Sequence, residues 1–342
     1  MKNKVLIIAE AGVNHNGSFE NAKKLILAGA EAGVDYVKFQ TFRANKLVSK
    51  VAEKADYQKR NTNDESDSQF EMLKKLEMPE TWHYDLIKYA ETLGIKFLST
   101  GFDEESIDFL ASLNIDLLKI PSGEITNKPF LEHISKKNKP IIISTGMANL
   151  EEVRAAIEVL QNNGTRKSSI TILHCNTEYP TPMLDVNLNA MISLKEAFDV
   201  NIGYSDHTLG IEVPIAAVAL GAKVIEKHFT LDKNMDGPDH KASLDPSELK
   251  QMVRAVRNIE KALSGSGIKE PSASELKNMQ IARKSIHTNK PLEKGTVLKK
   301  EDLVMMRPGD GISPMNIDLY LNKQISNNLP EGHKISKTDF IE

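Results

Sequence analysis

Residues 5–41 read VLIIAEAGVNHNGSFENAKKLILAGAEAGVDYVKFQT, which places a helical pattern between two short apolar runs. The runs are Val5–Ala9 and Tyr36–Gln40. Between them, small and apolar residues recur at i, i+3, i+4 and i+7 from Ala22 onward, the spacing of one helix face. Strand, helix and strand in this order predict two parallel strands joined by a crossover helix.

The same unit recurs along most of the chain. Eight β-α units in roughly 250 residues are typical of a closed parallel barrel, so we predict an α/β fold of the TIM (β/α)8 type. A doubly wound open sheet is the alternative, and the lack of a G-x-G-x-x-G motif after the first run counts against it. The six further apolar runs are Lys96–Thr100, Leu117–Ile120, Pro140–Thr145, Ile170–Cys175, Val200–Ser205 and Val224–His228.

The composition changes after Leu263. A polar stretch begins with Ser-Gly-Ser-Gly, and the residues beyond it form short apolar runs broken by Gly and Pro. We therefore predict a barrel domain over residues 1–263, a linker over 264–281 and a small, turn-rich β domain over 282–342. A β domain of this size has a marginal core by itself, so we expect it to pack on another surface.

Charge and cysteine content exclude several classes of protein. The chain has 342 residues with 44 Lys and Arg against 47 Asp and Glu, a net charge of −3, whereas nucleic-acid binders are usually basic. The single cysteine, Cys175, cannot form an internal disulfide, which fits a reducing compartment. The apolar runs are too short for a signal peptide or a bilayer span. We expect a cytoplasmic protein with no nucleic-acid or membrane partner.

The connection from Arg43 to Met78 is unusually long, polar and rich in charge. Connections longer than about 15 residues are usually lids, binding loops or disordered segments. Because it follows the second predicted strand, it should lie at the carboxyl-end rim of the barrel. A lid and a solvated excursion both remain open from the sequence.

Reactive side chains gather where the predicted strands end. In a barrel of this kind, these ends point into one shared mouth, where a purely structural barrel would carry turn residues instead. Here the ends carry Lys, His, Glu and hydroxyl side chains. The residues concerned are Glu10, Lys38, Gln40, Thr100, Lys119, Ser122, Glu124, Ser144, His174, Asn176, Glu178, Tyr179, Ser205, Asp206, His207, Glu226 and His228.

Two lysines, Lys38 and Lys119, come from different strands and converge on this mouth. Two ammonium groups beside the hydroxyls of Thr100, Ser122 and Ser144 suit a small polyanion such as a phosphorylated carboxylic acid. A Schiff-base aldolase is the rival interpretation, because a buried Lys can also be a nucleophile.

Two histidines, His207 and His228, end adjacent strands and can reach one divalent ion. Two imidazoles with no carboxylate beside them in the sequence leave positions open for water and substrate, which is a Lewis-acid arrangement. A closed zinc site is not expected, because Cys175 is the only thiol.

Ordered motifs extend through nearly the whole chain. They are AEAGVNHNG at 9–17, VKFQT at 37–41, KIPSGE at 119–124, STGM at 144–147, HCNTEYPTP at 174–182, GYSDHT at 203–208, EKHFT at 226–230 and GPDHKAS at 237–243. In this order they resemble the bacterial sialic acid synthases, a family that includes the legionaminic acid synthases. The tail, with RPG at 307–309, resembles their C-terminal antifreeze-like (SAF, β-clip) domain.

The resemblance implies an enzyme that condenses phosphoenolpyruvate with N-acetylmannosamine and water to give N-acetylneuraminate and phosphate. The alternative acceptor is a diacetamido-trideoxy hexose, which would give N,N′-diacetyllegionaminate. A sugar-binding protein that uses only the tail is the non-enzymatic alternative. The resemblance also implies dependence on Mn²⁺ or Mg²⁺, and a homodimer in which each tail domain covers the partner's barrel mouth.

The resemblance further assigns roles to residues of this chain. His207 and His228 would bind the metal, and His228 would also count among the catalytic residues. From its position at the end of the first strand, Glu10 is our own candidate to position or deprotonate the water. Lys38 and Lys119 would act in catalysis while binding phosphoenolpyruvate. The remaining substrate-binding candidates are Thr100, Ser122, Ser144, Asn176 and Thr177 on the phosphoenolpyruvate side, Gln40, Glu124, Tyr179 and Asp239 on the sugar side, and Arg307 from the other subunit.

Overall fold

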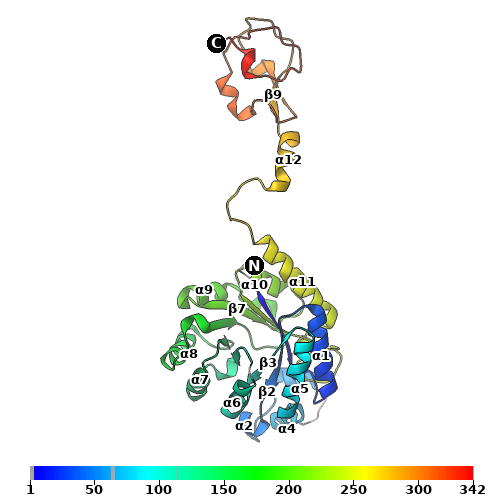
Figure 1. The fold of residues 1–342 in the computed structure, drawn as a ribbon, viewed down its shortest axis with the longest axis vertical. Helices are drawn as coiled ribbons and strands as arrows, with labels where there is room; N and C mark the ends of the chain where they lie inside the picture. The colour runs from blue at the N-terminus through cyan, green and yellow to red at the C-terminus, as the bar shows by residue number, and fades with distance from the viewer. Residues whose placement is uncertain (1–3, 63–65, 114, 342) are drawn as a thin grey trace. The chain divides into compact units, whose positions relative to one another are not determined.

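The computed structural model describes residues 4–62, 66–113 and 115–341 of the chain. Eight strands form a closed parallel barrel in chain order, β1 to β8, and Figure 1 shows helices around it. Each strand overlaps one of the apolar runs, so the predicted (β/α)8 barrel is confirmed. The strands are β1 (Leu6–Gly12), β2 (Tyr36–Thr41), β3 (Lys96–Gly101), β4 (Leu118–Ile120), β5 (Ile141–Ser144), β6 (Ile170–His174), β7 (Asn201–Asp206) and β8 (Val224–His228).

Several helices of the barrel, among them α1, α6, α8 and α11, begin at a polar side chain that accepts backbone N–H groups, and they bury one apolar face. In α8, Asn149 accepts backbone N–H groups at the start while Glu152 reaches back to the Asn149 N–H, which is the capping box expected from the sequence. The helices of this part of the chain are α1 (Phe19–Ala32), α2 (Ala44–Leu47), α3 (Asp56–Asn61), α4 (Gln69–Leu76), α5 (Glu80–Thr92), α6 (Glu104–Ser112), α7 (Lys128–Ser135), α8 (Leu150–Asn162), α9 (Asn189–Phe198), α10 (Glu212–Ala219) and α11 (Pro246–Ala262).

Helix α11 packs against α1 and α10 on the outside of the barrel. Its apolar side is buried, and Arg257 donates to the carbonyl oxygen of Val5, just before β1, at 2.8 Å. The same guanidinium is 2.8 Å from the carboxylate of Asp35, just before β2. Strands β1 and β8 pair directly, with Glu10 opposite His228, so the last strand returns to the first.

The long connection after β2 is folded rather than extended. It contains α2, α3 and α4, and its apolar residues Phe42, Met72 and Leu76 form a small buried cluster with Val13 from the loop after β1. Residues 63–65, the middle of its most polar stretch, lie outside the described residues. Since a buried cluster anchors the segment on the barrel, the part of the connection that the structure describes is not a solvated excursion.

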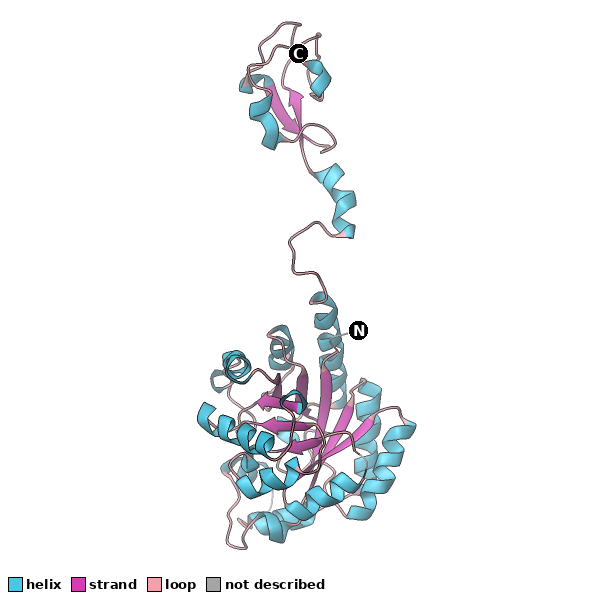
Figure 2. Ribbon diagram, turned by 60° about the vertical axis from the view of Figure 1, so that its left-hand side comes forward, coloured by secondary structure: helices cyan, strands magenta, loops and turns pink. Residues whose placement is uncertain are grey.

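The chain divides into two compact units, residues 1–264 and 265–342. Taken by itself, the second unit contains α12 (Ala273–Ala282) and the antiparallel pair β9 (Ser285–Thr288) and β10 (Leu303–Met306), which Figure 2 shows among loops and short helical turns. Its small core includes Ile286, Leu298, Ile325 and Ile335.

Part of the predicted linker is helical. Helix α12 lies within it because Ser272 and Glu275 form a capping box, which compensates for the absence of buried residues in the helix. In both units, no helix formed by the described residues combines the length and the apolar character needed to cross a bilayer.

Candidate active site

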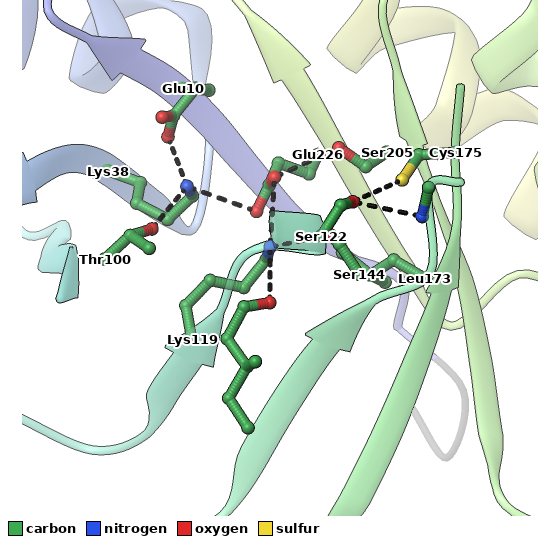
Figure 3. Close-up of polar contacts among 12 residues, drawn as sticks. Glu10, Lys38, Thr100, Lys119, Ser122, Ser144, Leu173, Cys175, Ser205 and Glu226 are labelled. Atoms are coloured by element: carbon green, nitrogen blue, oxygen red, sulfur yellow. Dashed lines mark hydrogen bonds and ion pairs between the residues drawn. The ribbon is translucent and has the colours of Figure 1, made fainter. Parts of the chain in front are cut away.

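Polar side chains from seven strands, β1 to β5 together with β7 and β8, meet inside the barrel at the carboxyl ends. Because side chains alternate along a strand, residues two apart share the inward face, as Lys38 and Gln40 do on β2 and Glu226 and His228 on β8. Lys38, Lys119, Glu226 and His228 are all at least 95 % buried. Figure 3 shows the lysine and glutamate side chains pointing toward one another.

Lys38 is the centre of one half of this cluster. Its Nζ lies 2.7 Å from Oε2 of Glu10 and 3.6 Å from Oε2 of Glu226. It also donates to the hydroxyl of Thr100 at 2.9 Å. The ammonium is therefore held by two carboxylates and one hydroxyl.

Lys119 is the centre of the other half. Its Nζ donates to the hydroxyl of Ser144 at 2.7 Å and lies 3.7 Å from Oε1 of Glu226. Glu226 also accepts from the hydroxyl of Ser205 at 3.0 Å. One carboxylate thus lies between the two lysines.

Glu226 received no role in the sequence analysis, although it was recognised as a strand-end residue. The signal that could have singled it out is its position two residues before His228, on the same inward face. Its partners lie on β2, β4 and β7, so only the closed barrel shows that it joins Lys38 to Lys119.

Burial and charge together shift the pKa values in this cluster. Burial raises the pKa of Glu10 to about 7, although the neighbouring Lys38 opposes the shift. Burial would also raise the pKa of Glu226, but Lys119 and Lys38 outweigh it and hold that pKa below its ordinary value. Burial lowers the pKa of Lys119, with Glu226 acting against the shift. At neutral pH, Glu226 is therefore charged and Glu10 is close to its midpoint.

The hydroxyl of Ser122 packs closely against the turn after β5. It accepts the N–H of Gly146 at 3.0 Å and lies 3.3 Å from the thiol sulfur of Cys175. A Cβ at Gly146 would come within 2.8 Å of that hydroxyl and 2.6 Å of the Thr177 methyl group. Glycine is therefore required here for the close approach of Ser122 and Thr177.

His207 and His228 lie next to each other on the adjacent strand ends, with ring centroids 5.3 Å apart. Nδ1 of His207 is hydrogen-bonded to the carbonyl oxygen of Asn176. This bond fixes the ring and leaves the lone pair of Nε2 available for a metal ion. Burial lowers the pKa of His207 to about 4 and that of His228 well below its ordinary value. Both rings are thus neutral at pH 7, as metal ligands must be.

These residues fit a divalent cation. Nδ1 of His228 is buried and has no hydrogen-bond partner among the described residues, and a carboxylate oxygen of Asp239 lies 3.9 Å from it. Burial raises the pKa of Asp239 to about 7. Within the described parts of the chain, no three His, Cys, Asp or Glu residues form a metal-binding group, so an ion held by the two imidazoles would keep open positions.

Strand β1 leaves space between Glu10 and His228. A bulge between Glu10 and Gly12 breaks its register with β2, and Gly12 has φ of +53°. A Cβ there would lie 3.3 Å from Oε1 of Glu10 and 3.5 Å from the ring of His228. The bare glycine therefore leaves the space between the carboxylate and the imidazole free.

An aromatic stack covers the two imidazoles. The ring of Tyr179 lies 4.1 Å from that of His207 at 30°, and 5.5 Å from that of His228 at 90°. Tyr57 of α3 stacks on Tyr179 from the other side, with ring centroids 4.9 Å apart. Tyr57 was missed in the sequence analysis, because the polar segment around it carries no periodic signal.

Helix α3 is held across the rim by three polar contacts. Arg60 pairs with Glu178 at 2.7 Å, in the loop after β6. The side-chain amide of Asn61 donates to the carbonyl oxygen of Pro238 at 2.8 Å, and Lys241 donates to the carbonyl oxygen of Arg60. Helix α3 therefore lies over the histidine side of the mouth.

Gln40 lies at the edge of the lysine cluster, where its side-chain amide donates to Oε1 of Glu10 at 3.5 Å. Two predicted site residues stand apart from these clusters. Glu124 accepts from Asn127 in its own turn. Arg307 belongs to the second compact unit, where its Nε donates to the carbonyl oxygen of Ala282. Their predicted contacts with a sugar remain predictions.

Comparison with known proteins identifies two regions. Residues 25–269 match the NeuB family, and residues 283–341 match the SAF domain. The chain is 54 % identical to an N,N′-diacetyllegionaminic acid synthase of Campylobacter jejuni over 97 % of this chain and 99 % of that protein. It is 53 % identical to an enzyme of the same name from Legionella pneumophila, over 95 % of this chain and 92 % of that one.

A solved structure shows the same fold. It is the N-acetylneuraminic acid (sialic acid) synthetase of Leptospira borgpetersenii, crystallised with citrate, which is 33 % identical with a TM-score of 0.70. The match covers 81 % of this chain and 90 % of that chain.

Replacing Glu226 with Gln is expected to destabilise the barrel by about 3–5 kcal/mol at pH 7, the usual cost of leaving a buried charge without its partner. The loss should shrink toward pH 9. Burial already lowers the pKa of Lys119, and without Glu226 it falls further. The folded protein then binds fewer protons than the unfolded chain, so its unfolding free energy rises with pH.

Urea unfolding of wild type and variant at about pH 7 and pH 9 measures this difference. Glu178→Gln is the matched control, because its ion pair with Arg60 is exposed and should contribute less than about 1 kcal/mol. An equal loss for Glu226→Gln at both pH values would contradict the proposed charge balance.

Proposed function

The chain belongs to the NeuB family, and we propose that it condenses phosphoenolpyruvate with an open-chain N-acetylated amino sugar and water, releasing inorganic phosphate. The observation that carries this proposal is the shared carboxylate of Glu226. It lies between two lysines that are buried beside hydroxyl groups, within the same mouth as two neutral imidazoles.

Lys38 and Lys119 would bind the phosphate and carboxylate of phosphoenolpyruvate. Ammonium groups that are already buried and oriented bind an anion without further reorganisation, which is the general basis of electrostatic catalysis. The hydroxyls of Thr100 and Ser144 hold the two lysines, and that of Ser122 lies beside Ser144. Asn176 and Thr177 follow β6, where Asn176 bonds to His207 and Thr177 lies beside Gly146.

His207 and His228 would hold the divalent cation, Mn²⁺ or Mg²⁺. When bound, such an ion polarises a carbonyl oxygen as a Lewis acid. The fixed ring of His207 and the unpartnered Nδ1 of His228 support this assignment.

The reaction balances with one water. C3 of phosphoenolpyruvate forms a bond to the aldehyde carbon of the sugar, whose carbonyl π bond opens so that its oxygen becomes a hydroxyl. C2 takes up hydroxide from the water, whose other proton balances that new hydroxyl. The C2–O bond to phosphate then breaks, and the proton of the C2 hydroxyl leaves with the phosphate, which leaves the new carbonyl group and free phosphate. Glu10, with a pKa of about 7, can accept the proton of that water at neutral pH.

We propose the diacetamido-trideoxy hexose as the acceptor, with N,N′-diacetyllegionaminate as the product. The two relatives that carry this name are 54 % and 53 % identical to the chain, whereas the sialic acid synthetase is 33 % identical. This favours the alternative of the sequence analysis over N-acetylmannosamine. Gln40, Glu124, Tyr179 and Asp239 are the proposed contacts to the sugar.

A phosphate-release assay with phosphoenolpyruvate, Mn²⁺ and each sugar in turn tests the acceptor. We expect kcat/KM to be at least roughly tenfold higher for the diacetamido-trideoxy hexose, a difference that a few pocket contacts can supply. A higher kcat/KM for N-acetylmannosamine would instead support N-acetylmannosamine as the acceptor, as the resemblance first implied.

Two other results would remove the proposal altogether. A borohydride-trapped adduct on Lys38 or Lys119, formed in the presence of chelator, would indicate a Schiff-base aldolase. Sugar binding without phosphate release would indicate a binding protein.

Glu10→Gln is expected to lower kcat by about 10²–10⁴-fold if Glu10 is the base. The carboxyl of Glu10 is protonated below its pKa of about 7, so wild-type kcat/KM should fall as the pH drops through 7. The residual kcat/KM of Glu10→Gln should not show this fall as the pH drops through 7. Glu20→Gln, on the exposed face of α1, is the control. Wild-type turnover with an unchanged pH profile would exclude this role.

We also propose a cytoplasmic homodimer in which the tail domain covers the partner's barrel mouth. Exposed apolar side chains on both units support it, since such surfaces mark interfaces. Met147, Leu184 and Leu209 lie in the loops after β5, β6 and β7, at the mouth end, and Met315 and Leu319 lie on the tail domain.

Complementation between full-length subunits tests the dimer. Arg307→Ala and Lys119→Ala should each be inactive alone, because every site in either dimer lacks one group. Mixed after subunit exchange, they should recover roughly a quarter of wild-type activity, since half of random dimers carry one intact site. No recovery, with exchange confirmed by native mass spectrometry, would contradict the swapped arrangement.

A further inference from the structure

A second buried ion pair lies directly behind the two histidines. Lys227 and Asp206 are paired across β7 and β8, and the side chains of both have 0 % exposure. They occupy the outward face of the sheet, which packs against α10, because each immediately precedes one of the inward-facing histidines. The pair therefore touches neither the mouth nor a substrate.

This pair restrains the backbone on both sides of His207. Nζ of Lys227 bonds to the carboxylate of Asp206 and donates to the carbonyl oxygen of Thr208. Asp206 in turn accepts the N–H of Thr208 at 3.1 Å and its hydroxyl at 2.9 Å. One ammonium on β8 thus ties the residues before and after His207 to the residue that precedes His228.

His228 depends on this restraint more than His207 does. The ring of His207 has a hydrogen bond to Asn176, whereas Nδ1 of His228 has no hydrogen-bond partner among the described residues. The placement of the second imidazole therefore comes from the backbone of β8, where Lys227 is anchored.

A contribution to stability alone does not account for an ion pair at this position. Desolvating two charges is costly, and a buried pair can often be replaced by apolar residues of similar volume without loss of stability. What apolar residues cannot reproduce is the directed bonding of Lys227 to both Asp206 and Thr208.

We propose that Lys227 and Asp206 are positioning residues that set the spacing of His207 and His228, and thereby the affinity of this site for its divalent cation. The proposal rests on the assignment of the two histidines as metal ligands. Neighbours of metal ligands that orient them typically change metal affinity by about 10–100-fold when removed.

The test uses the full-length, metal-free protein and Mn²⁺ alone. The double variant Lys227→Met with Asp206→Leu removes both charges and keeps the core apolar. We expect it to fold with a lowered thermal midpoint, because the buried N–H and hydroxyl of Thr208 lose their acceptor. Its Kd for Mn²⁺, measured by electron paramagnetic resonance titration, should rise about 10–100-fold. Its affinity for phosphoenolpyruvate without metal should stay unchanged.

A matched pair at the opposite end of the barrel provides the control. Arg257→Met with Asp35→Leu removes an ion pair between α11 and the residue before β2. Arg257 also bonds to the backbone of Val5, just before β1 and far from the mouth. This control variant is expected to lower the thermal midpoint and leave the Kd for Mn²⁺ unchanged.

Asp206→Asn is the conservative variant, because an amide oxygen still accepts from Lys227 and Thr208. Its Kd should lie between those of the wild type and the double variant, and it carries the test if the double variant does not fold. A wild-type Kd in a folded double variant, or in Asp206→Asn if that is the variant tested, would overturn the positioning role.

A different result would show that the metal assignment itself is wrong. If the wild type does not bind Mn²⁺, or if His228→Ala binds it as the wild type does, the histidines are not the ligands and the positioning proposal falls with them. Weaker Mn²⁺ binding in both the double variant and His228→Ala would support the metal assignment and the positioning role together.

Discussion

The carboxylate of Glu226 is the contact on which the barrel mouth depends. Lys38 and Lys119 are nearly fully buried, and two ammonium groups in such a place would repel each other and lose their hydration. Glu226 lies within 4 Å of both, and Glu10, Thr100 and Ser144 supply the remaining bonds. Only a closed barrel can bring groups from so many strands to one carboxylate, so the fold and the charge balance require each other.

The mouth is divided into two electrostatic halves. On one side, the carboxylate of Glu226 lies between the two lysines. On the other, burial keeps His207 and His228 neutral and raises the pKa of Asp239 to about 7. The proposed reaction joins a phosphorylated acid to an aldehyde and would use both environments close together. Tyr179 and α3 cover the neutral half.

The motifs of the family do not distinguish the two candidate acceptors. The motifs that led to the family lie at the strand ends, and the groups they supply suit phosphoenolpyruvate and a cation. Both acceptors need these groups equally. The sugars differ in substituents that only a few side chains would contact. A change of acceptor therefore needs few substitutions in the sequence. Overall similarity to the legionaminic acid synthases therefore decides between them better than any motif does.

The sequence by itself determined the eight strands and the residues at their ends, because apolar runs and side-chain alternation are local properties. Lys38, Lys119, His207 and His228 could all be named from it. The bridge of Glu226, the stack of Tyr57 on Tyr179 and the clamp from Lys227 to Asp206 were decided only by the tertiary structure. Each joins residues far apart in the chain, and their distances are set by barrel closure and strand register, which no local pattern encodes.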